Sequence, residues 1–243
     1  MRRAVVKKSK ASGFIVAIDG PSGAGKSTVS RKLAEALGGN LLDTGGMYRG
    51  VAYHAIKRNV TGETALARLA RSLIFGTKAG SSDILINDEN LRAKLRTEAV
   101  SEKASEISRF AQVRKILTRE QRSLARTWAK RIPVVVEGRD IGTVVFPSVP
   151  FKFFVTASPQ VRAKRRLDQL KKQGHTDISL EQILRQNHNR DRQDSARKIA
   201  PLRCANDAVV VDTSSMAIHQ VVHFMEDHIR GRMKLVKRKS LRT

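Results

Sequence analysis

The stretch FIVAIDGPSGAGKST, residues 14–28, is an apolar run followed directly by a glycine-rich loop. Residues 20–28 match the pattern G-x-x-x-x-G-K-[ST], and residues 29–37 continue with apolar side chains at helical spacing. A strand, a glycine-rich turn and a helix in this order form the phosphate-binding loop of P-loop nucleotide-binding proteins. A glycine-rich turn that binds nothing is the alternative, and the presence of both flanking elements disfavours it.

The residue types in this loop suit phosphate binding. Gly20, Gly23 and Gly25 allow positive φ angles, so that successive backbone N–H groups can point at phosphate oxygens. The helix that begins near Lys26 adds the positive end of its dipole. The Lys26 ammonium is expected between the β- and γ-phosphates, and the Ser27 hydroxyl is expected to hold Mg²⁺.

The 243-residue chain is long enough for one large domain or for a core with an inserted subdomain. Its formal net charge is +25, and basic residues gather at both ends. Residues 1–10 hold five basic residues, residues 230–243 hold seven, and neither end holds an acidic one. Such ends can contact nucleic acid nonspecifically. Solvated, flexible tails are the interpretation we favour, because neither end carries aromatic side chains that could stack on bases.

The cysteine content and the hydropathy indicate the compartment. Cys204 is the only cysteine, which excludes an internal disulfide framework and favours a reducing environment. No apolar run approaches the ~20 residues of a membrane span. The basic N-terminus precedes only about five apolar residues, fewer than the apolar segment of a signal peptide. We therefore expect a cytoplasmic protein without membrane contact.

Apolar runs alternate with helical patterns along the chain. Core strands are predicted at 14–18, 40–43, 133–137, 151–155 and 208–212. The intervening helical patterns include 47–57, 98–130 and 215–230. This alternation predicts an α/β fold with a five-stranded parallel sheet of the P-loop NTPase type and helices on both faces.

One segment breaks the alternation. After a loop at 77–82, residues 83–88 show a strand pattern that enters a turn, so residues 62–100 are predicted to form an inserted, β-containing subdomain. In open parallel sheets, ligands bind beyond the carboxyl ends of the strands. Residues 19–28, 43–49 and 137–140 are therefore expected to meet in one crevice.

Five stretches together resemble the bacterial cytidylate kinases. They read AIDGPSGAGKST (17–28), LLDTGGMYR (41–49), LRTEAVS (95–101), EGRDIGTVVFP (137–147) and RDRQDSARKIAPL (190–202). They stand in the family's order and span nearly all of residues 14–230. The resemblance implies transfer of the γ-phosphoryl group of MgATP to CMP or dCMP. It also implies a core domain at 13–61 and 131–231, a monophosphate-binding region at 62–130, a helical lid at about 159–197, and basic tails at 1–12 and 232–243.

The resemblance also implies roles for individual residues. ATP would contact Gly20, Pro21, Ser22, Gly23, Ala24, Gly25, Lys26, Ser27, Thr28, Arg165 and Arg166. CMP would contact Thr44, Arg49, Ser105, Arg114, Arg139, Asp140, Arg190, Asp194 and Arg197. Catalytic roles fall on Lys26, Arg139 and Arg190, and Ser27 would bind the metal.

Within that set, Ser105, Arg114 and Asp140 would read the cytosine edge, which needs an acceptor for its amine and donors for its ring acceptors. Thr44 stands where the family has serine and keeps the hydroxyl. Glu137 stands where some members have aspartate, and its extra methylene moves the carboxylate by about 1.5 Å. The resemblance therefore assigns Glu137 no role.

Helix geometry adds two expectations. Arg190, Asp194 and Arg197 have the spacing i, i+4, i+7, which predicts one stripe of a helix, either as part of the site or as a solvated face. Ser105 and Arg114 would lie about 180° apart on a continuous helix. Because both are expected to face one base, we predict a break in the helix near residues 109–112.

Two other functions stay open at this stage. The first is a nucleoside monophosphate kinase that acts on UMP or AMP. The second is a nucleotide-dependent RNA-binding protein with a P-loop, which the net charge of +25 would suit.

Overall fold

The computed structural model describes residues 13–77, 84–172, 174 and 178–240. Its main sheet is parallel, with the strand order β2-β6-β1-β7-β8. The strands are β1 (Ile15–Asp19), β2 (Asn40–Asp43), β6 (Val134–Glu137), β7 (Phe151–Thr156) and β8 (Val209–Asp212). All five lie within one residue or so of the predicted runs, which confirms the predicted sheet.

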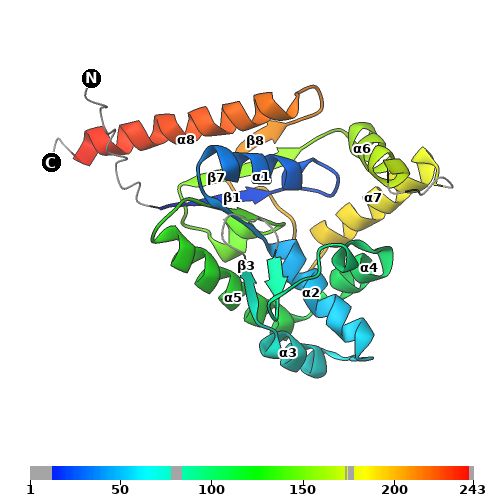
Figure 1. The fold of residues 1–243 in the computed structure, drawn as a ribbon. Helices are drawn as coiled ribbons and strands as arrows, with labels where there is room; N and C mark the ends of the chain where they lie inside the picture. Colours follow the sequence, from blue (N-terminus) through cyan, green and yellow to red (C-terminus); the bar gives the residue numbers. More distant parts are fainter. Residues whose placement is uncertain (1–12, 78–83, 173, 175–177, 241–243) are drawn as a thin grey trace, which may run out of the picture.

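Helices cover both faces of this sheet (Figure 1). Helices α1 (Lys26–Ala36) and α8 (Ile218–Ser240) pack on one face, and α2 (Thr44–Lys57), α3 (Glu63–Ser72) and α5 (Ala111–Ala129) lie on the other. The sheet has a hydrophobic core on each face, and successive residues of β6 contribute to opposite cores. Val135 packs in the core under α1 and α8, and Val136 packs in the core under α2 and α5. Burial on both faces explains why the strands are continuous apolar runs.

The insertion carries a small antiparallel sheet of its own, with the order β3-β4-β5. Its strands are β3 (Phe75–Thr77), β4 (Ile84–Ile86) and β5 (Glu89–Asn90), and a 3₁₀ helix, η1 (Lys94–Arg96), follows. Asn87 and Asp88 connect β4 to β5 with positive φ angles of 51° and 63°, as a tight hairpin turn requires. Most of the predicted loop at 77–82 lies outside the described residues.

The predicted break in the long helical segment is confirmed. Helix α4 (Glu98–Ile107) ends before α5 begins at Ala111. Between them, Phe110 has an extended backbone, with φ −80° and ψ 121°. Residues 98–130, whose sequence pattern is helical throughout, thus form two helices and not one.

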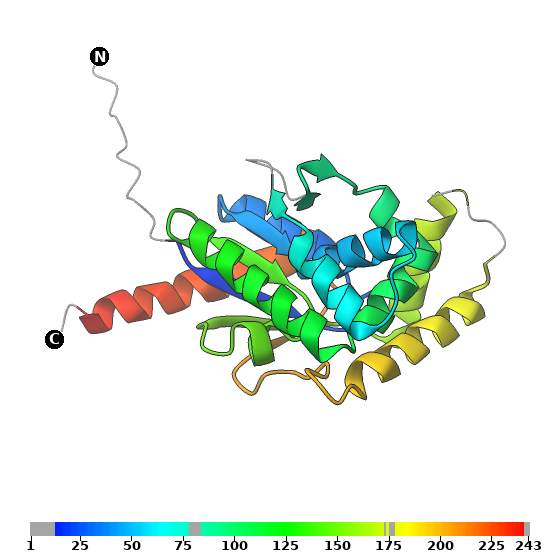
Figure 2. The same ribbon diagram turned by 90° about the horizontal axis from the view of Figure 1, so that it is seen from below.

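The lid region is a pair of helices, α6 (Pro159–Lys172) and α7 (Leu180–Ser195), at the end of the sheet where the strands point (Figures 1 and 2). Ser179 and Gln182 begin α7 with a capping box. The prediction that Arg190, Asp194 and Arg197 lie on one stripe of a helix is wrong for Arg197. Helix α7 ends at Ser195, so Arg197 lies beyond the helix.

Two other boundaries differ from the sequence prediction. Helix α2 begins at Thr44 rather than Met47, because the Asp43 carboxylate accepts the Gly46 N–H and caps it. Helix α8 runs to Ser240, so the stretch from 232 to 240 is helical and not the tail we expected. The helix passes through Gly231, which disfavours a helix by about 1 kcal/mol relative to alanine, and no proline follows within it. Residues 1–12, the other predicted tail, lie outside the described residues.

Residues 141–145 form a short π-helix, η2 (Ile141–Val145), that the sequence did not predict. None of the helices in the described ranges combines the length and the apolar composition needed to cross a lipid bilayer.

Candidate active site

The loop between β1 and α1 has the conformation of a phosphate cradle. Gly20, Gly23 and Gly25 have φ angles of 145°, 75° and 87°, in the region predicted for them. A Cβ atom on Gly20 would lie 2.0 Å from the Val155 carbonyl oxygen, so no other residue fits there. A Cβ atom on Gly23 would lie 3.1 Å from Arg162 of helix α6. The loop is thus held between the sheet and the lid.

Lys26 is buried at the start of α1, where its Nζ donates a hydrogen bond of 2.6 Å to the Pro21 carbonyl oxygen. Burial and, after it, the charge of Arg139 lower the pKa of Lys26 to about 7, although Glu137 and Asp19 act in the opposite direction. A nearby phosphate would favour the charged ammonium. The loop therefore holds a desolvated cation in position for a polyphosphate.

Glu137, at the end of β6, connects the cradle to the neighbouring strand. Its Oε1 accepts a hydrogen bond of 2.8 Å from the Ser27 hydroxyl, and its carbonyl oxygen accepts one of 2.7 Å from Thr44. Its Oε2 is buried and has no hydrogen-bond partner within the described residues. Burial raises the pKa of Glu137, as does the charge of Asp43.

The second half of the site is a buried ion pair between Arg114 of α5 and Asp140. The Arg114 Nη2 and Asp140 Oδ2 atoms are 2.5 Å apart, and fewer than a tenth of either side chain is exposed. Arg114 also donates to the Ser108 carbonyl oxygen at 3.1 Å and lies 5.7 Å from the centre of the Tyr48 ring. Burial raises the pKa of Tyr48 to about 12, so the phenol stays a hydrogen-bond donor.

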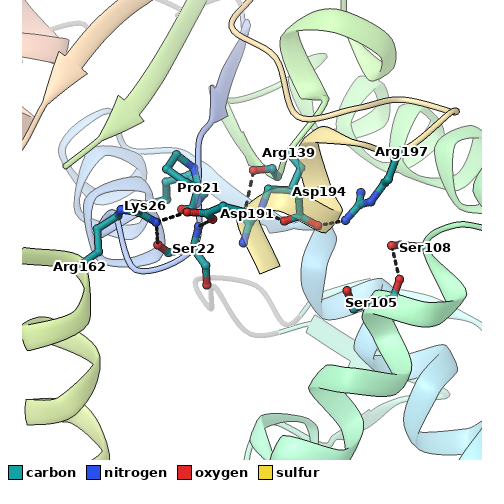
Figure 3. A network of polar contacts seen from close by, with 11 residues as sticks. Pro21, Ser22, Lys26, Ser105, Ser108, Arg139, Arg162, Asp191, Asp194 and Arg197 are labelled. Atoms are coloured by element: carbon teal, nitrogen blue, oxygen red, sulfur yellow. Dashed lines mark hydrogen bonds and ion pairs between the residues drawn. The ribbon is translucent and has the colours of Figure 1, made fainter. Parts of the chain in front are cut away.

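Ser105, the third predicted base-reading residue, lies on the last turns of α4, on the far side of the helix break from Arg114. Its carbonyl oxygen accepts a hydrogen bond of 2.7 Å from the Ser108 hydroxyl (Figure 3). Ser108 therefore links the Ser105 backbone to the Arg114 guanidinium.

Asp194 of helix α7 joins the lid to the turn that follows β6. This carboxylate is buried and accepts hydrogen bonds from Arg139 Nε, at 3.0 Å, and from Arg197 (Figure 3). Burial and the charge of Arg139 lower the pKa of Arg190 to about 10, against the pull of Asp194. Three of the predicted arginines thus gather around one carboxylate.

A second contact ties the lid to the cradle itself. Asp191 of α7 accepts the Ser22 N–H at 3.3 Å and also pairs with Arg162 of α6. Arg162 in turn donates to the Ser22 carbonyl oxygen at 3.1 Å and to that of Ala157 at 3.0 Å. Figure 3 shows the contacts among Ser22, Asp191 and Arg162, next to the hydrogen bond between Lys26 and Pro21.

The remaining predicted arginines have their own partners. Arg165 donates to the hydroxyl and the carbonyl oxygen of Thr213 at 2.9 and 2.6 Å, and Arg166 donates to Gln169 at 3.0 Å. Arg49 pairs with Asp43 at 2.6 Å. Their predicted contacts with ATP and CMP stay predictions.

Comparisons with known proteins show which family the chain belongs to. The family model described as cytidylate kinase matches residues 16–231. The chain belongs to the cytidylate kinase family. It is 44% identical to "Cytidylate kinase" of Methylococcus capsulatus, over 86% of this chain and 93% of that one. It is 43% identical to "Cytidylate kinase" of Geobacter sulfurreducens, over 90% of this chain and 94% of that one. Among solved structures, shikimate kinase from Bacteroides thetaiotaomicron aligns with a TM-score of 0.47 and 12% identity, over 89% of this chain and 98% of that one.

Several residues that build the site in this member of the cytidylate kinase family were given no individual role from the sequence. The position of Asp19 and Glu137 at strand ends was the available signal, because ligand sites collect there. Arg162 and Asp191 carried no such signal, since charged residues on lid helices usually face solvent. Only their contact with the loop reveals them.

Asp19 supports the turn that carries Arg139 and Asp140. Its two carboxylate oxygens accept the backbone N–H groups of Ile141 and Gly142 at 2.7 and 2.6 Å. The side chain is buried, and burial raises its pKa from 3.8 to about 6 although these hydrogen bonds lower it.

This shift predicts a pH-dependent contribution to stability. Between pH 3.8 and about 6 the folded protein keeps a proton on Asp19 that the unfolded chain releases. The contribution is therefore largest below pH 3.8 and is lost as the pH rises to about 6. Asp19→Asn removes the titration, so the free energy of unfolding of the wild type minus that of the variant should fall by about 2 kcal/mol between about pH 4.5 and about pH 7. Urea unfolding at both pH values measures it, and parallel pH profiles of the two proteins would contradict the shift.

Proposed function

We propose that this protein transfers the γ-phosphoryl group of MgATP to CMP or dCMP and releases ADP and CDP or dCDP. One observation carries the proposal. Residues 137–140 contact both halves of the site, since Glu137 binds Ser27 of the phosphate cradle and Asp140 binds Arg114 of the predicted base pocket. Donor and acceptor sites would therefore share one short segment at the end of β6. Family membership supports the same reaction.

The acceptor half suits a cytosine nucleotide. Asp140 supplies acceptor oxygens for an exocyclic amine, and Arg114 supplies donors for ring acceptors. Because the two charges already pair at 2.5 Å in a buried place, they are held in position before a base arrives. Asp194 and Arg197 lie on the lid side, where sugar hydroxyls would be bound.

The reaction needs no general base from the protein. The second pKa of a phosphate monoester is about 6, so the acceptor oxygen is largely ionised near neutral pH. The side chains have to bring two anionic groups together and to neutralise their charge. Lys26, Arg139 and Arg190 would supply this positive charge. The contacts of α7 with Ser22 and Arg139 support a lid that would exclude water.

The residues around Ser27 fit a magnesium ion. Mg²⁺ prefers oxygen ligands, and Glu137 has a buried Oε2 without a partner in the described parts of the chain, next to the Ser27 hydroxyl. Ser27 and Glu137 would therefore hold the ion directly or through its water molecules. When bound, Mg²⁺ neutralises charge on the phosphate oxygens.

Glu137→Gln tests this fit. The variant keeps the shape of the side chain and loses its charge, so the Mg²⁺ concentration that gives half-maximal activity should rise about tenfold or more. Titrating activity with Mg²⁺ at saturating ATP and CMP measures the effect. Glu35→Gln, an exposed glutamate of the same helix as Ser27, is the matched control and should behave like the wild type. An unchanged Mg²⁺ dependence in Glu137→Gln would remove Glu137 from the metal site.

The proposed reaction is tested by release of ADP with each acceptor in turn. We expect turnover with CMP and dCMP, and at least about tenfold lower kcat/KM with UMP and AMP, because their base edges do not match Asp140 and Arg114. Formation of CDP is checked by chromatography. ATP hydrolysis that RNA stimulates and CMP does not would support the RNA-binding alternative instead.

A further inference from the structure

The two lid helices form a unit with a small hydrophobic core of their own. Its members are Ala163 and Leu170 of α6 and Ile183 of α7, with Leu167, Ile178 and Leu184 packed around them. Within the described residues, this cluster shares no member with either core of the main sheet. Apolar burial therefore holds α6 and α7 to each other, and the polar contacts of the lid take the larger part in placing the two helices on the sheet.

Helix α7 contacts both halves of the proposed site within one turn (Figure 3). Asp191 accepts the Ser22 N–H of the phosphate loop at 3.3 Å. Asp194 accepts a hydrogen bond of 3.0 Å from Arg139 Nε, in the turn that also carries Asp140. The two carboxylates are three residues apart, so they lie on the same side of the helix. One turn of α7 thus bridges the cradle and the predicted acceptor pocket.

Ser22 is bound to the lid through both of its backbone polar groups. Its N–H donates to Asp191, and its carbonyl oxygen accepts a hydrogen bond of 3.1 Å from Arg162. Arg162 is buried, pairs with Asp191, and donates from Nε to the Ala157 carbonyl oxygen at 3.0 Å. A guanidinium suits such bridging, because its N–H groups are fixed in one plane. The Arg162–Asp191 pair therefore holds this residue of the loop from two sides.

These contacts make the position of the loop depend on the position of α7. A nucleotide that binds Arg139 and Asp194 also orders α7, and α7 orders Ser22 through Asp191. Ordering a helix costs conformational entropy, and the first nucleotide to bind meets that cost. The second nucleotide then binds to a site that is already ordered, so the two affinities are coupled.

We propose that Arg162 and Asp191 are positioning residues that link the phosphate loop to α7 and make the binding of ATP and of the acceptor nucleotide cooperative. Neither residue belongs to the sets that the family resemblance assigns to ATP or CMP. Both act through Ser22 and α7 and not through contact with the reacting groups. The inference rests on the proposed function for the identity of the two nucleotides as ATP and CMP.

Calorimetry measures this coupling directly. A non-hydrolysable ATP analogue with Mg²⁺ is titrated into the full-length protein, first without CMP and then at saturating CMP. The ratio of the two dissociation constants is the coupling factor, and we expect a factor of about ten for the wild type. Because coupling between two binding sites is reciprocal, titrating CMP without and with the analogue should give the same factor.

The double variant Arg162→Met, Asp191→Leu removes the pair and leaves the net charge unchanged. Apolar side chains of similar size often replace a buried ion pair without loss of the fold. The coupling factor should fall to within about twofold of one, and the analogue alone should bind about threefold more weakly, because Ser22 has lost two hydrogen bonds to the lid. CMP alone should bind within about twofold of the wild type, since Asp194 and Arg139 are unchanged.

The lid offers a matched control and a milder variant. Glu181 and Arg185 form an exposed ion pair of 3.0 Å on the same helix, so Glu181→Leu, Arg185→Met should keep the wild-type coupling factor. Asp191→Asn keeps the size of the side chain and one acceptor oxygen, which guards against a double variant that does not fold. Its coupling factor should be about threefold below that of the wild type.

A coupling factor of wild-type size in either variant of the Arg162–Asp191 pair would overturn the inference, as would a factor of one in the wild type. A merely structural role would weaken CMP alone as much as the analogue alone, and that result would overturn it too. Failure of the proposed function gives a different result. In that case the wild type would bind no CMP and form no CDP, while the analogue alone would still bind more weakly to the double variant than to the control.

Discussion

Lys26→Ala is expected to lower kcat for phosphoryl transfer by about a thousandfold while the protein stays folded. Removing one preorganised donor to a developing negative charge typically costs a factor of about 10² to 10³ in kcat. Lys26 is buried and already aligned by its 2.6 Å hydrogen bond to the Pro21 carbonyl oxygen, so bulk water cannot replace its ammonium easily.

The fold should survive because the charge of Lys26 does not stabilise it. Burial lowers the pKa of this lysine to about 7, which means that the folded protein disfavours the ammonium relative to water. Steady-state kinetics with CMP and ATP give kcat, and circular dichroism melting reports the fold. Lys32→Ala, an exposed lysine on the same helix, is the control and should keep normal turnover. Near-normal kcat in Lys26→Ala would contradict the role proposed for it.

Arg114→Ala and Asp140→Ala should each raise the KM for CMP by about a hundredfold and change the KM for ATP little. Both residues belong to the predicted acceptor pocket, and truncating one partner of a buried, hydrogen-bonded charge pair costs about 2 to 5 kcal/mol in binding. Kinetics in which each substrate is varied at saturation of the other separate the two effects. Equal changes in both KM values would refute the placement of the pair.

The burial of this pair requires a control for stability. Removing one partner leaves the other charge buried and unpaired. This can lower the free energy of unfolding by about 3 to 5 kcal/mol. Asp140→Asn keeps the shape and one acceptor, so it should fold and still bind CMP more weakly than the wild type. Arg109→Ala, at an exposed position in the break between α4 and α5, should affect neither KM.

The strands, the glycines of the phosphate loop and the helix break were predictable, because each depends on residues close together in the sequence. The central strands β1, β6 and β7 are short runs that are largely buried on both faces, so a continuous apolar stretch such as residues 134–136 identifies them. The edge strand β8 is partly exposed and was recognised from its apolar run alone. The three glycines of the loop were predictable because positive φ excludes most other residues. The break at 108–110 followed from helix periodicity once Ser105 and Arg114 were assigned to one base.

Helix ends were less predictable. Asp43 caps α2 three residues earlier than the apolar spacing indicated, and α8 continues to Ser240, past its predicted end near Arg230. Arg197 was placed on α7 by its spacing, yet the chain leaves the helix at Ser195 and still reaches Asp194. The start of α2 and the position of Arg197 depend on a side-chain cap and on an ion pair, which residue periodicity does not encode.

The amino-acid sequence by itself determined the parallel sheet, the phosphate loop and the residue types available for an acceptor pocket, since these depend on burial patterns and on backbone preferences of near neighbours. Only the tertiary structure decided which polar groups from distant parts of the sequence contact one another. Ser27 and Glu137 are 110 residues apart and Ser22 and Asp191 are 169 apart, and no local pattern pairs residues at such separations. Their contacts arise because parallel strands end at one edge and the lid helices pack over it, which is a property of the packed chain.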